Sequence, residues 1–341
     1  MSLSTTTSGI QDIIGSDVRK WMEIAFFVIA SGVISFLGSI ANVMVIVVFF
    51  KQGFSDSINI SLLGLAVADL GSLLTLVWMS ICFNPLFRYS GISFESIDIQ
   101  YITAGWPHVC FARITSWITA FITLERCLCI ATPHRVKQFL TPKRTLVIIL
   151  LIYLFLFLSV APVYYALRIG PHFDDSRNKT LDGLVYADDG TAVENVSFAI
   201  SVFAQLSSCA CVIICTVVLI INLTRKSQWR NTSLETSSAK PTMSNRDKRV
   251  VLMVASISCI FIACFLPSAI NLILMLHFSP NYSIVGPYQN SFQVSWSILN
   301  TLEATNSSVS VLVYYKMSSK FRLVFRETFC ITRSTGTYRR G

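Results

Sequence analysis

The sequence alternates between long apolar stretches and shorter polar connections. A helix needs roughly 20 mostly apolar residues to cross about 30 Å of hydrocarbon, and several stretches of the chain are that long. They cover residues 22–50, 59–82, 103–131, 145–168, 197–224, 250–277 and 289–315. The pattern therefore predicts an all-α membrane protein that folds as a bundle of seven transmembrane helices.

The composition agrees with lipid as the solvent for much of the chain. Hydrophobic residues make up 53% of the 341 residues, and charged residues make up only 13%. Soluble domains carry about 25% charged residues, so this chain lies well outside their range. The connections between the apolar stretches are too short to hold a separate soluble domain.

The basic residues lie mostly on one side of the predicted membrane. With the N-terminus outside, the inner loops and tail hold 20 Lys and Arg against five acids, and the outer segments hold six against eleven acids. Positive charge near helix ends marks the cytoplasmic side, so we place the N-terminus outside. Contact with anionic inner-leaflet lipid accounts for the net charge of +9, and nucleic acid is not expected as a partner.

This topology divides the chain into three parts. We expect an extracellular segment at 1–21, a transmembrane domain at 22–315 and a cytoplasmic helix and tail at 316–341. The first segment is polar, so no cleaved signal peptide is predicted. The outer connections contain three Asn-x-Ser/Thr sequons where glycosylation is expected. These begin at Asn178, Asn195 and Asn281.

The segment after the seventh apolar stretch has a helical pattern of its own. Phe321, Val324 and Phe325 fall on one face at helical spacing, with basic residues opposite. This pattern predicts a short amphipathic eighth helix on the inner membrane surface. Cys330 follows it and is a candidate palmitoylation site.

Short motifs follow one another along the predicted helices. In chain order they are Gly38 with Asn42, Leu65-Ala66-Val67-Ala68-Asp69-Leu70, Glu125-Arg126-Cys127, Phe261 with Cys264-Phe265-Leu266-Pro267, Ser310-Val311-Leu312-Val313-Tyr314, and Phe321. In this order and on these helices, the motifs resemble those of rhodopsin-like (class A) G-protein-coupled receptors. The resemblance covers about residues 25–328.

The chain also departs from that family's pattern. Helix seven lacks the family's Asn and Pro, helix four has no Trp, helix five has no Pro, and Cys127 replaces a tyrosine. These features, and the stretch Trp106-Pro107-His108-Val109-Cys110, resemble the divergent chemosensory receptors of gastropod molluscs. Invertebrate neuropeptide receptors are the next most similar group.

The resemblance implies a receptor in the plasma membrane and not an enzyme. Such a receptor binds an extracellular small molecule or peptide and activates a heterotrimeric G protein, with receptor kinases and arrestin as further partners. A chemosensory role is the first expectation, and a neuropeptide receptor is the alternative. A channel or transporter is a third interpretation, although the absence of an internal repeat counts against inverted-repeat transporters.

The resemblance places a switch for the G protein at the inner helix ends, in Glu125, Arg126, Asp247 and Tyr314. Asp247 falls 20 residues before Pro267, where the family's locking acid lies. In the resting state Asp247 would hold Arg126, and activation would swing helix six outward about the Pro267 kink. The alternative is an ordinary charge cluster at the membrane boundary.

A second group of residues is polar and lies in the middle of the predicted membrane. It consists of Asp69, Thr115, Asn306, Ser307 and Ser310. These match positions that surround an allosteric sodium ion in the family, and an Asp in lipid needs oxygen, amide or cation partners. The alternative is a protonated Asp69 that is merely hydrogen-bonded.

A third group lies near the floor of the family's ligand cavity. Arg113 on helix three and Glu303 on helix seven are both intramembrane charges. They either form a buried salt bridge between the two helices or bind a charged or zwitterionic ligand. Phe265 takes the place of the family's toggle tryptophan, and simple core packing is its alternative role.

The family's usual disulfide has no direct counterpart. That bond joins the outer end of helix three to the second outer loop, but this loop contains no cysteine. A Cys82–Cys110 bond is the remaining pairing on the same side. Strict sulfur geometry limits whether it forms.

The chain lacks the residues that other classes of seven-helix protein require. A retinal pigment needs a helix-seven lysine, but no lysine occurs between 289 and 315, and Ala304 stands near the expected site. The four histidines are scattered without metal-ligand spacing, so no metal site is predicted. Apart from the sodium ion, no cofactor is expected.

Overall fold

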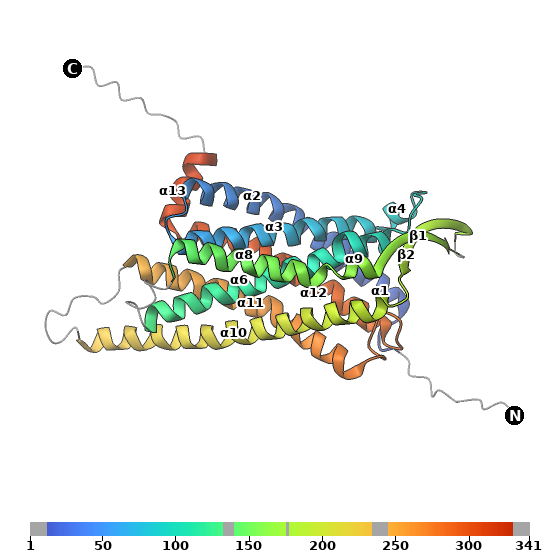
Figure 1. Cartoon of the computed structure of the whole chain (residues 1–341). Coiled ribbons are helices and arrows are strands. Elements are labelled where there is room, and N and C mark those ends of the chain that lie inside the picture. The colour runs from blue at the N-terminus through green and yellow to red at the C-terminus, as the bar shows by residue number, and fades with distance from the viewer. Residues whose placement is uncertain (1–11, 132–139, 175–176, 234–244, 330–341) are drawn as a thin grey trace, which may run out of the picture.

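The computed structural model describes residues 12–131, 140–174, 177–233 and 245–329, without the side chains of residues 131, 223–233 and 245–248. In these ranges seven long helical segments form one bundle, as predicted (Figure 1). In chain order the elements are α1 (Ser16–Met22), η1 (Glu23–Ser31), α2 (Gly32–Gln52), α3 (Ser57–Phe83), α4 (Pro85–Arg88), α5 (Ser96–Gln100), η2 (Tyr101–Gly105), α6 (Trp106–Ala131), α8 (Pro142–Val160), α9 (Val163–Ala166), β1 (Leu167–Asp174), β2 (Lys179–Tyr186), α10 (Gly190–Ser233), α11 (Asn245–Phe278), α12 (Gln289–Met317) and α13 (Ser319–Phe329).

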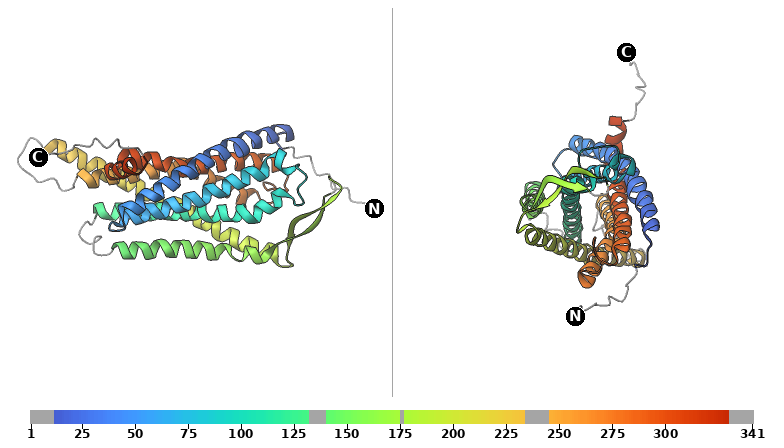
Figure 2. Two further views of the ribbon diagram at one scale, coloured as in Figure 1. Left: turned by 90° about the horizontal axis from the view of Figure 1, so that it is seen from above. Right: turned by 90° about the vertical axis from the view of Figure 1, so that its right-hand side faces the viewer.

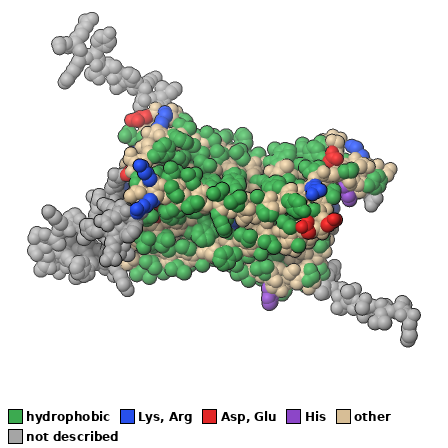
Figure 3. Space-filling view, viewed as in Figure 1, with side chains coloured by type: hydrophobic (Ala, Val, Ile, Leu, Met, Phe, Trp, Pro, Cys, Tyr) green, Lys and Arg blue, Asp and Glu red, His purple; other side chains and the backbone are tan. Residues whose placement is uncertain are grey.

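The outer surface of the bundle is suited to lipid. Figure 3 shows hydrophobic side chains over the middle of the bundle and charged side chains toward its two ends. On α8, for example, Leu151, Phe155 and Leu158 are each more than half exposed. Five helices of the described ranges are long and apolar enough to cross a membrane. The protein is therefore a multi-pass membrane protein.

The two long helices outside those five are α6 and α12. They carry several charged and polar side chains in their interior, including Arg113 and Glu303. Both of these side chains are buried inside the bundle. Burial against other helices keeps charged groups away from lipid, so the low hydropathy of these two helices is compatible with a central position.

Close packing of the first and seventh helical segments depends on a glycine. A Cβ added to Gly38 on α2 would lie only 2.0 Å from the Oγ of Ser308 on α12. Asn42, one turn further along α2, donates through Nδ2 to the carbonyl oxygens of Gly38 and Ser307 at 3.0 and 2.9 Å. The Gly38 and Asn42 motif thus holds α2 against α12.

The outer end of the fourth helix differs from the prediction. The apolar pattern predicts a helix to residue 168, but α8 ends at Val160, and a short α9 leads into β1 at Leu167. Pro162 lies between the two helices and has no backbone N–H to continue the hydrogen bonding of α8. β1 and β2 form an antiparallel hairpin with Leu167 opposite Tyr186 and Asp174 opposite Lys179.

The hairpin belongs to the outer end of the bundle. It projects from the same end as α1 and α4, and the end-on view of Figure 2 shows it over the ring of helices. A fully α-helical description therefore misses this element. The sequence predicted a membrane helix up to residue 168 and an outer connection after it, so neither strand was predicted.

Ion pairs fasten the hairpin to the preceding outer loop. The carboxylate of Glu95 forms ion pairs with two arginines. Its Oε1 lies 3.0 Å from Nε of Arg88, and its Oε2 lies 2.6 Å from Nη2 of Arg177. The backbone of Asp182 on β2 also bonds to Ser93 and to Glu95, at 3.0 and 2.8 Å. We call Glu95, Arg88 and Arg177 the Glu95 cluster. The Glu95 cluster joins the first outer loop to the second outer loop, the loop to which the family's usual disulfide is attached.

The possible Cys82–Cys110 disulfide is not formed, because both thiols are free and buried. Cys110 packs in the main apolar core with Trp106 and Ile114. Cys82 is buried near the end of α3, where its carbonyl oxygen accepts a hydrogen bond from Ser96. The two cysteines thus occupy separate packing environments.

The amphipathic eighth helix is confirmed as α13, which turns across the inner end of the bundle (Figure 1). Phe321 is fully buried and packs near the rings of Phe49 and Tyr314. Val324 and Phe325 are partly buried against the same core. Cys330, the candidate palmitoylation site, lies outside the described residues.

Candidate functional site

The predicted salt bridge between Arg113 and Glu303 is not formed. Glu303 on α12 instead pairs with His108 on α6, whose Nε2 lies 3.2 Å from Oε2 of Glu303. The Oγ of Ser268 on α11 donates to Oε1 of Glu303 at 2.9 Å. All of these side chains are buried. A buried link between helices three and seven therefore exists, but a histidine supplies it.

Helix geometry explains why the partner is His108. His108 and Arg113 are five residues apart on α6, which corresponds to roughly 140° of rotation at about 3.6 residues per turn. The two side chains therefore leave the helix on different faces. His108 reaches Glu303 on α12, whereas Arg113 reaches Gln205 on α10.

Arg113 is a buried cation with an amide partner in place of an acid. Its Nη1 donates to Oε1 of Gln205, and the Oγ of Ser116 lies 3.3 Å from the same oxygen. The Nε of Arg113 is buried and has no hydrogen-bond partner. No acid lies within ion-pair distance of Arg113 in the described part of the chain. Such a group favours any acceptor or anion that reaches it.

His108 connects this site to the polar residues of α3. Its Nδ1 lies 3.2 Å from the Oγ and 3.4 Å from the carbonyl oxygen of Ser72. With Nε2 facing Glu303, both ring nitrogens of His108 lie within hydrogen-bond distance of oxygen atoms. Ser72 lies three residues after Asp69 on the same helix.

Asp69 gathers two hydroxyl groups from neighbouring helices. Its Oδ1 accepts from Thr115 on α6 at 3.0 Å and from Ser307 on α12 at 2.9 Å. The side chain is completely buried, and Oδ2 has no hydrogen-bond partner. Ser310 donates to the carbonyl of Asn306 at 3.4 Å on the same side of α12. Of the predicted polar group, Thr115 and Ser307 thus contact the Asp69 carboxylate directly.

This donor set suits a small hard cation. A carboxylate and hydroxyl oxygens are the ligands that such cations prefer, and Oδ2 of Asp69 is left free for one. Among the described residues, no group of three or more His, Cys, Asp and Glu side chains has the arrangement of a metal site. The residues present therefore fit a sodium ion better than a transition metal.

The charged pair at the inner end of α6 forms within the helix. The Nη2 of Arg126 lies 2.7 Å from Oε1 of Glu125, while Oε2 of Glu125 and Nε of Arg126 have no hydrogen-bond partner. Asp247 belongs to α11, but its side chain lies outside the described residues. The lock between Arg126 and Asp247 therefore stays a prediction.

Two uncharged contacts join the inner half of α6 to its neighbours. Thr123 and Ser258 on α11 bring their hydroxyl oxygens to 2.8 Å, and both are buried. The thiol of Cys127 donates to the carbonyl of Cys215 on α10 at 2.9 Å. These contacts fix α6 against α10 and α11 independently of the charged pair.

Phe265 of the predicted ligand pocket and Tyr314 of the predicted switch are both fully buried. Phe265 is fully buried and stacks on Phe261 at 4.5 Å between ring centroids, two residues before Pro267 inside α11. Tyr314 on α12 is also fully buried, but its hydroxyl has no hydrogen-bond partner. Its ring packs 5.5 Å from that of Phe49.

Several residues of the site were not identified from the sequence. They are His108, Gln205, Ser268, Thr123 and Ser258. His108 and Gln205 carried a usable signal, because polar side chains within apolar helices usually face the bundle interior. Ser and Thr carry no such signal, since their hydroxyls can bond to their own helix.

The three sequons lie at the outer end of the bundle, with exposed asparagines. Asn178 occupies the turn of the hairpin with a φ of 47°, in the left-handed region that Asn tolerates. Asn281 lies in the connection before α12, as predicted. Asn195 lies within the first turns of α10, which begins earlier than predicted. Glycosylation at these sites stays a prediction.

The chain is similar to several receptors of invertebrates. It is 22% identical over 299 residues to Neuropeptide receptor 22 of Caenorhabditis elegans, covering 86% of this chain and 65% of that protein. It is 25% identical over 334 residues to the Neuromedin U receptor homolog nmur-2 of Caenorhabditis elegans, covering 88% and 78%. It is 22% identical over 314 residues to the Tachykinin-like peptides receptor 86C of Drosophila melanogaster, covering 91% and 60%.

These relatives are mostly longer proteins, and the chain spans less than two thirds of two of them. A family model gives the broader relationship. The model described as "Serpentine type 7TM GPCR chemoreceptor Srw" matches residues 28–332, which include all seven long helical segments and α13. The chain therefore belongs to the Srw family of serpentine seven-transmembrane G-protein-coupled chemoreceptors.

Proposed function

We propose that this protein is a plasma-membrane receptor that binds an extracellular ligand and promotes nucleotide exchange on a heterotrimeric G protein. Its N-terminus lies outside the cell, as the excess of Lys and Arg on the other side indicates. The family match and the bundle of seven long helices support this proposal. Receptor kinases and arrestin are further partners of the inner surface, where the Ser- and Thr-rich segment 225–249 offers hydroxyl groups for phosphorylation.

The single observation that carries the ligand assignment is the unpaired donor of Arg113. Its Nε is buried without a hydrogen-bond partner. Among the described side chains, its Nη1 donates only to the amide oxygen of Gln205. A ligand carboxylate or carbonyl oxygen would supply the missing acceptor, and a charge-assisted hydrogen bond of this kind contributes about 1.5–3 kcal/mol. The ligand is therefore a small molecule with an acidic or carbonyl group.

The contacts of Arg113 supply a route to the inner surface. A ligand oxygen that competes with Gln205 for the guanidinium changes the contact between α6 and α10. Phe261 and Phe265 of α11 pack in one apolar cluster with Ala112, next to Arg113. A displacement at Arg113 thus reaches α11 beside Pro267, the proposed hinge for its outward swing.

The sodium ion acts on the resting state in this proposal. Asp69, Thr115 and Ser307 would hold it, with Asn306 and Ser310 nearby on α12. When bound, the ion supplies a positive charge that compensates the buried Asp69 carboxylate. Such an ion favours the conformation in which α3, α6 and α12 stay together.

A neuropeptide ligand is the second candidate. It is favoured by the printed names of the relatives, which describe receptors for neuropeptides, neuromedin U and tachykinin-like peptides. It is also favoured by the hairpin, because an extended peptide can add a strand to an open sheet edge. Ser93 and Glu95 occupy part of the β2 edge, so β1 offers the edge for such a peptide.

A reporter of G-protein activation in transfected cells tests the proposal. Cells are exposed to free amino acids, small odorants and amidated peptides, and the class that gives a response identifies the ligand chemistry. Arg113→Gln should shift the half-maximal concentration by about tenfold or more. Arg168→Gln removes an exposed charge on β1 and serves as the matched control. Arg126→Ala provides the signalling-dead reference.

Two results contradict the proposal. A full response of Arg113→Gln at unchanged ligand concentration would remove the assigned role of Arg113. A ligand-gated current in membranes without G protein would instead identify a channel.

A further inference from the structure

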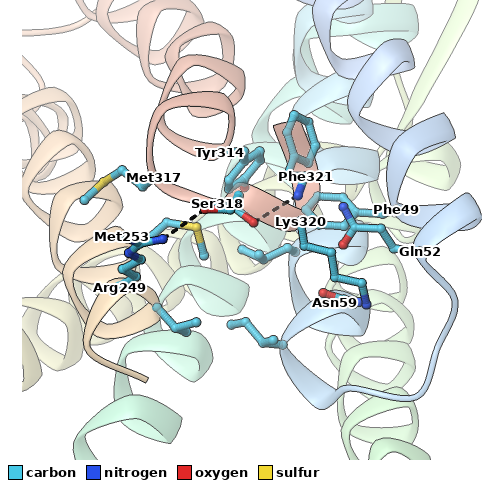
Figure 4. A pocket seen from close by; sticks show the side chains of 14 residues that line it. Phe49, Gln52, Asn59, Arg249, Met253, Tyr314, Met317, Ser318, Lys320 and Phe321 are labelled. Atoms are coloured by element: carbon cyan, nitrogen blue, oxygen red, sulfur yellow. Dashed lines mark hydrogen bonds between the residues drawn. The ribbon is translucent and has the colours of Figure 1, made fainter. Parts of the chain in front are cut away.

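A cavity of about 410 Å³ opens at the inner end of the bundle. Figure 4 shows it between α2, α3, α11, α12 and the start of α13. Its floor is apolar and includes Phe49, Leu62, Met253 and Phe321. The ligand and sodium sites proposed above lie elsewhere, and Tyr314 is the one lining residue to which a receptor role was assigned.

The polar atoms that line the cavity are mostly donors. The hydroxyl of Tyr314 and the Nε2 of Gln52 are buried and have no hydrogen-bond partner. These two donors lack an acceptor among the described residues.

Two positively charged side chains line the same cavity. Arg249 on α11 donates through Nη1 to the Oγ of Ser319 at 3.0 Å, and Lys320 on α13 carries no ion pair among the described side chains. None of the described residues that line the cavity is acidic. The cavity thus combines two positive charges, unpaired donors and an apolar floor.

We propose that this cavity binds the phosphate headgroup of an anionic lipid from the inner leaflet. Phosphate oxygens are strong acceptors for Arg and Lys and complement the charge of the lining. The apolar floor gives an acyl chain of the same molecule a surface to contact. A lipid is the occupant because α13, which forms one wall, is an amphipathic helix of the kind that lies on the membrane surface.

The bound lipid also restrains the receptor, a consequence that rests on the function proposed above. Arg249 belongs to α11, whereas Lys320 belongs to α13. A phosphate that contacts both joins the inner end of α11 to the end of α12 and α13. It therefore opposes an outward swing of α11 and lowers basal activation of the G protein.

The test uses the full chain in nanodiscs of phosphatidylcholine, with or without phosphatidylinositol 4-phosphate. Native mass spectrometry counts the bound lipid, and inorganic phosphate is the soluble probe. Lys320→Gln should weaken lipid binding about fivefold, and Gln52→Leu should weaken it by removing an unpaired donor. Lys316→Gln removes an exposed basic residue of α12 outside the cavity and should leave binding unchanged.

The outcomes separate the lipid site from the receptor function. Equal binding by Lys320→Gln, Lys316→Gln and the unaltered chain overturns the proposal, and so does inorganic phosphate that binds as tightly as the lipid. Because binding is counted without a G protein, failure of the receptor proposal leaves this measurement intact. Lower basal nucleotide exchange in the lipid-containing nanodiscs, reversed by Lys320→Gln, supports the restraint on α11.

Discussion

His108 on α6 and Glu303 on α12 form a buried hydrogen bond, with Nε2 of the imidazole 3.2 Å from Oε2 of the carboxylate. Ser268 adds a hydrogen bond from α11, and Ser72 meets the other ring nitrogen from α3. Four helices therefore meet through two side chains. The pair occupies the outer half of the bundle, next to the proposed ligand donor Arg113.

Replacing Glu303 should destabilise the bundle. Glu303→Gln removes the charge while keeping the shape, and it leaves His108 and Ser268 with a weaker acceptor. We expect a loss of about 1–3 kcal/mol, because a buried hydrogen-bonded carboxylate is difficult to replace. Thermal unfolding of the purified receptor measures the change. Ser268→Ala removes one of the two donors and should have a smaller effect, so an equal or larger effect would contradict this assignment.

Breaking the contact between Thr123 and Ser258 should raise basal signalling. Their hydroxyl oxygens lie 2.8 Å apart and join α6 to α11, the helix expected to move. One such hydrogen bond contributes about 1 kcal/mol, which corresponds to roughly a fivefold shift in a two-state equilibrium. The measurement is nucleotide exchange without ligand for the Thr123→Val and Ser258→Ala double variant.

The control for that experiment is Ser256→Ala. The Ser256 hydroxyl bonds to the carbonyl of Leu252 on its own helix at 2.9 Å. Its removal should leave basal exchange unchanged. If the double variant behaves like Ser256→Ala, the Thr123 contact does not restrain α11.

Sodium should stabilise the receptor through Asp69. Thr115 and Ser307 donate to one carboxylate oxygen, and the other oxygen is free for an ion. We expect a higher melting temperature in sodium chloride than in choline chloride at equal ionic strength. Asp69→Asn should abolish the difference. Equal melting temperatures of the unaltered chain in the two salts would favour a protonated, hydrogen-bonded Asp69.

The Glu95 cluster should hold the hairpin in place of a disulfide. Glu95→Gln removes the charge that Arg88 and Arg177 share. We expect amide hydrogen exchange in β2 to accelerate about fivefold, and high salt to accelerate it in the unaltered chain by screening. Asp188→Asn removes an exposed acid of the same loop and is the control. A reducing agent should have no effect on this exchange, because Cys82 and Cys110 are free.

Acid should weaken the attachment of the N-terminal segment to α12. Oδ2 of Asp12 accepts from the backbone N–H of Asn290 at 2.7 Å and of Ser291 at 3.1 Å, in the first turn of that helix. Burial raises the pKa of Asp12, but hydrogen bonds from Ser291, Ile14 and Asn290 outweigh it and hold the pKa below its usual range. A lowered folded-state pKa stabilises the fold above the unfolded-state pKa, and this stabilisation is lost as pH falls through the folded-state value.

Melting temperatures measured against pH test this linkage. The difference between the unaltered chain and Asp12→Asn should be constant near neutral pH, should begin to decline at about pH 4, where an unfolded Asp protonates, and should vanish once the pH is below the lowered folded-state pKa. Asp17→Asn changes an exposed acid of α1 and should show no such difference. A difference that persists in acid would show that Asp12 acts through packing and not through its charge.

Periodicity and hydropathy were enough to predict the helices. The seven apolar stretches became the seven long helical segments, and the spacing of Phe321, Val324 and Phe325 correctly gave α13 its buried face. The same signals failed after α8, because the apolar stretch continues to residue 168 although α8 ends at Val160, and the connection after it was not predicted to form strands. Pro162 marked the break, but the prediction continued the helix through it.

The sequence by itself determined which residues need partners, because a charged or amide side chain in a membrane helix is costly without one. It singled out Asp69, Arg113, Glu125, Arg126 and Glu303 for this reason. Only the tertiary structure decided which residues bind these side chains. His108, and not Arg113, reaches Glu303, because helix rotation and the packing of α6 between α10 and α12 set the direction of each side chain. Contacts between residues far apart in the chain produce no local periodicity in the sequence, so these partners could not be predicted from it.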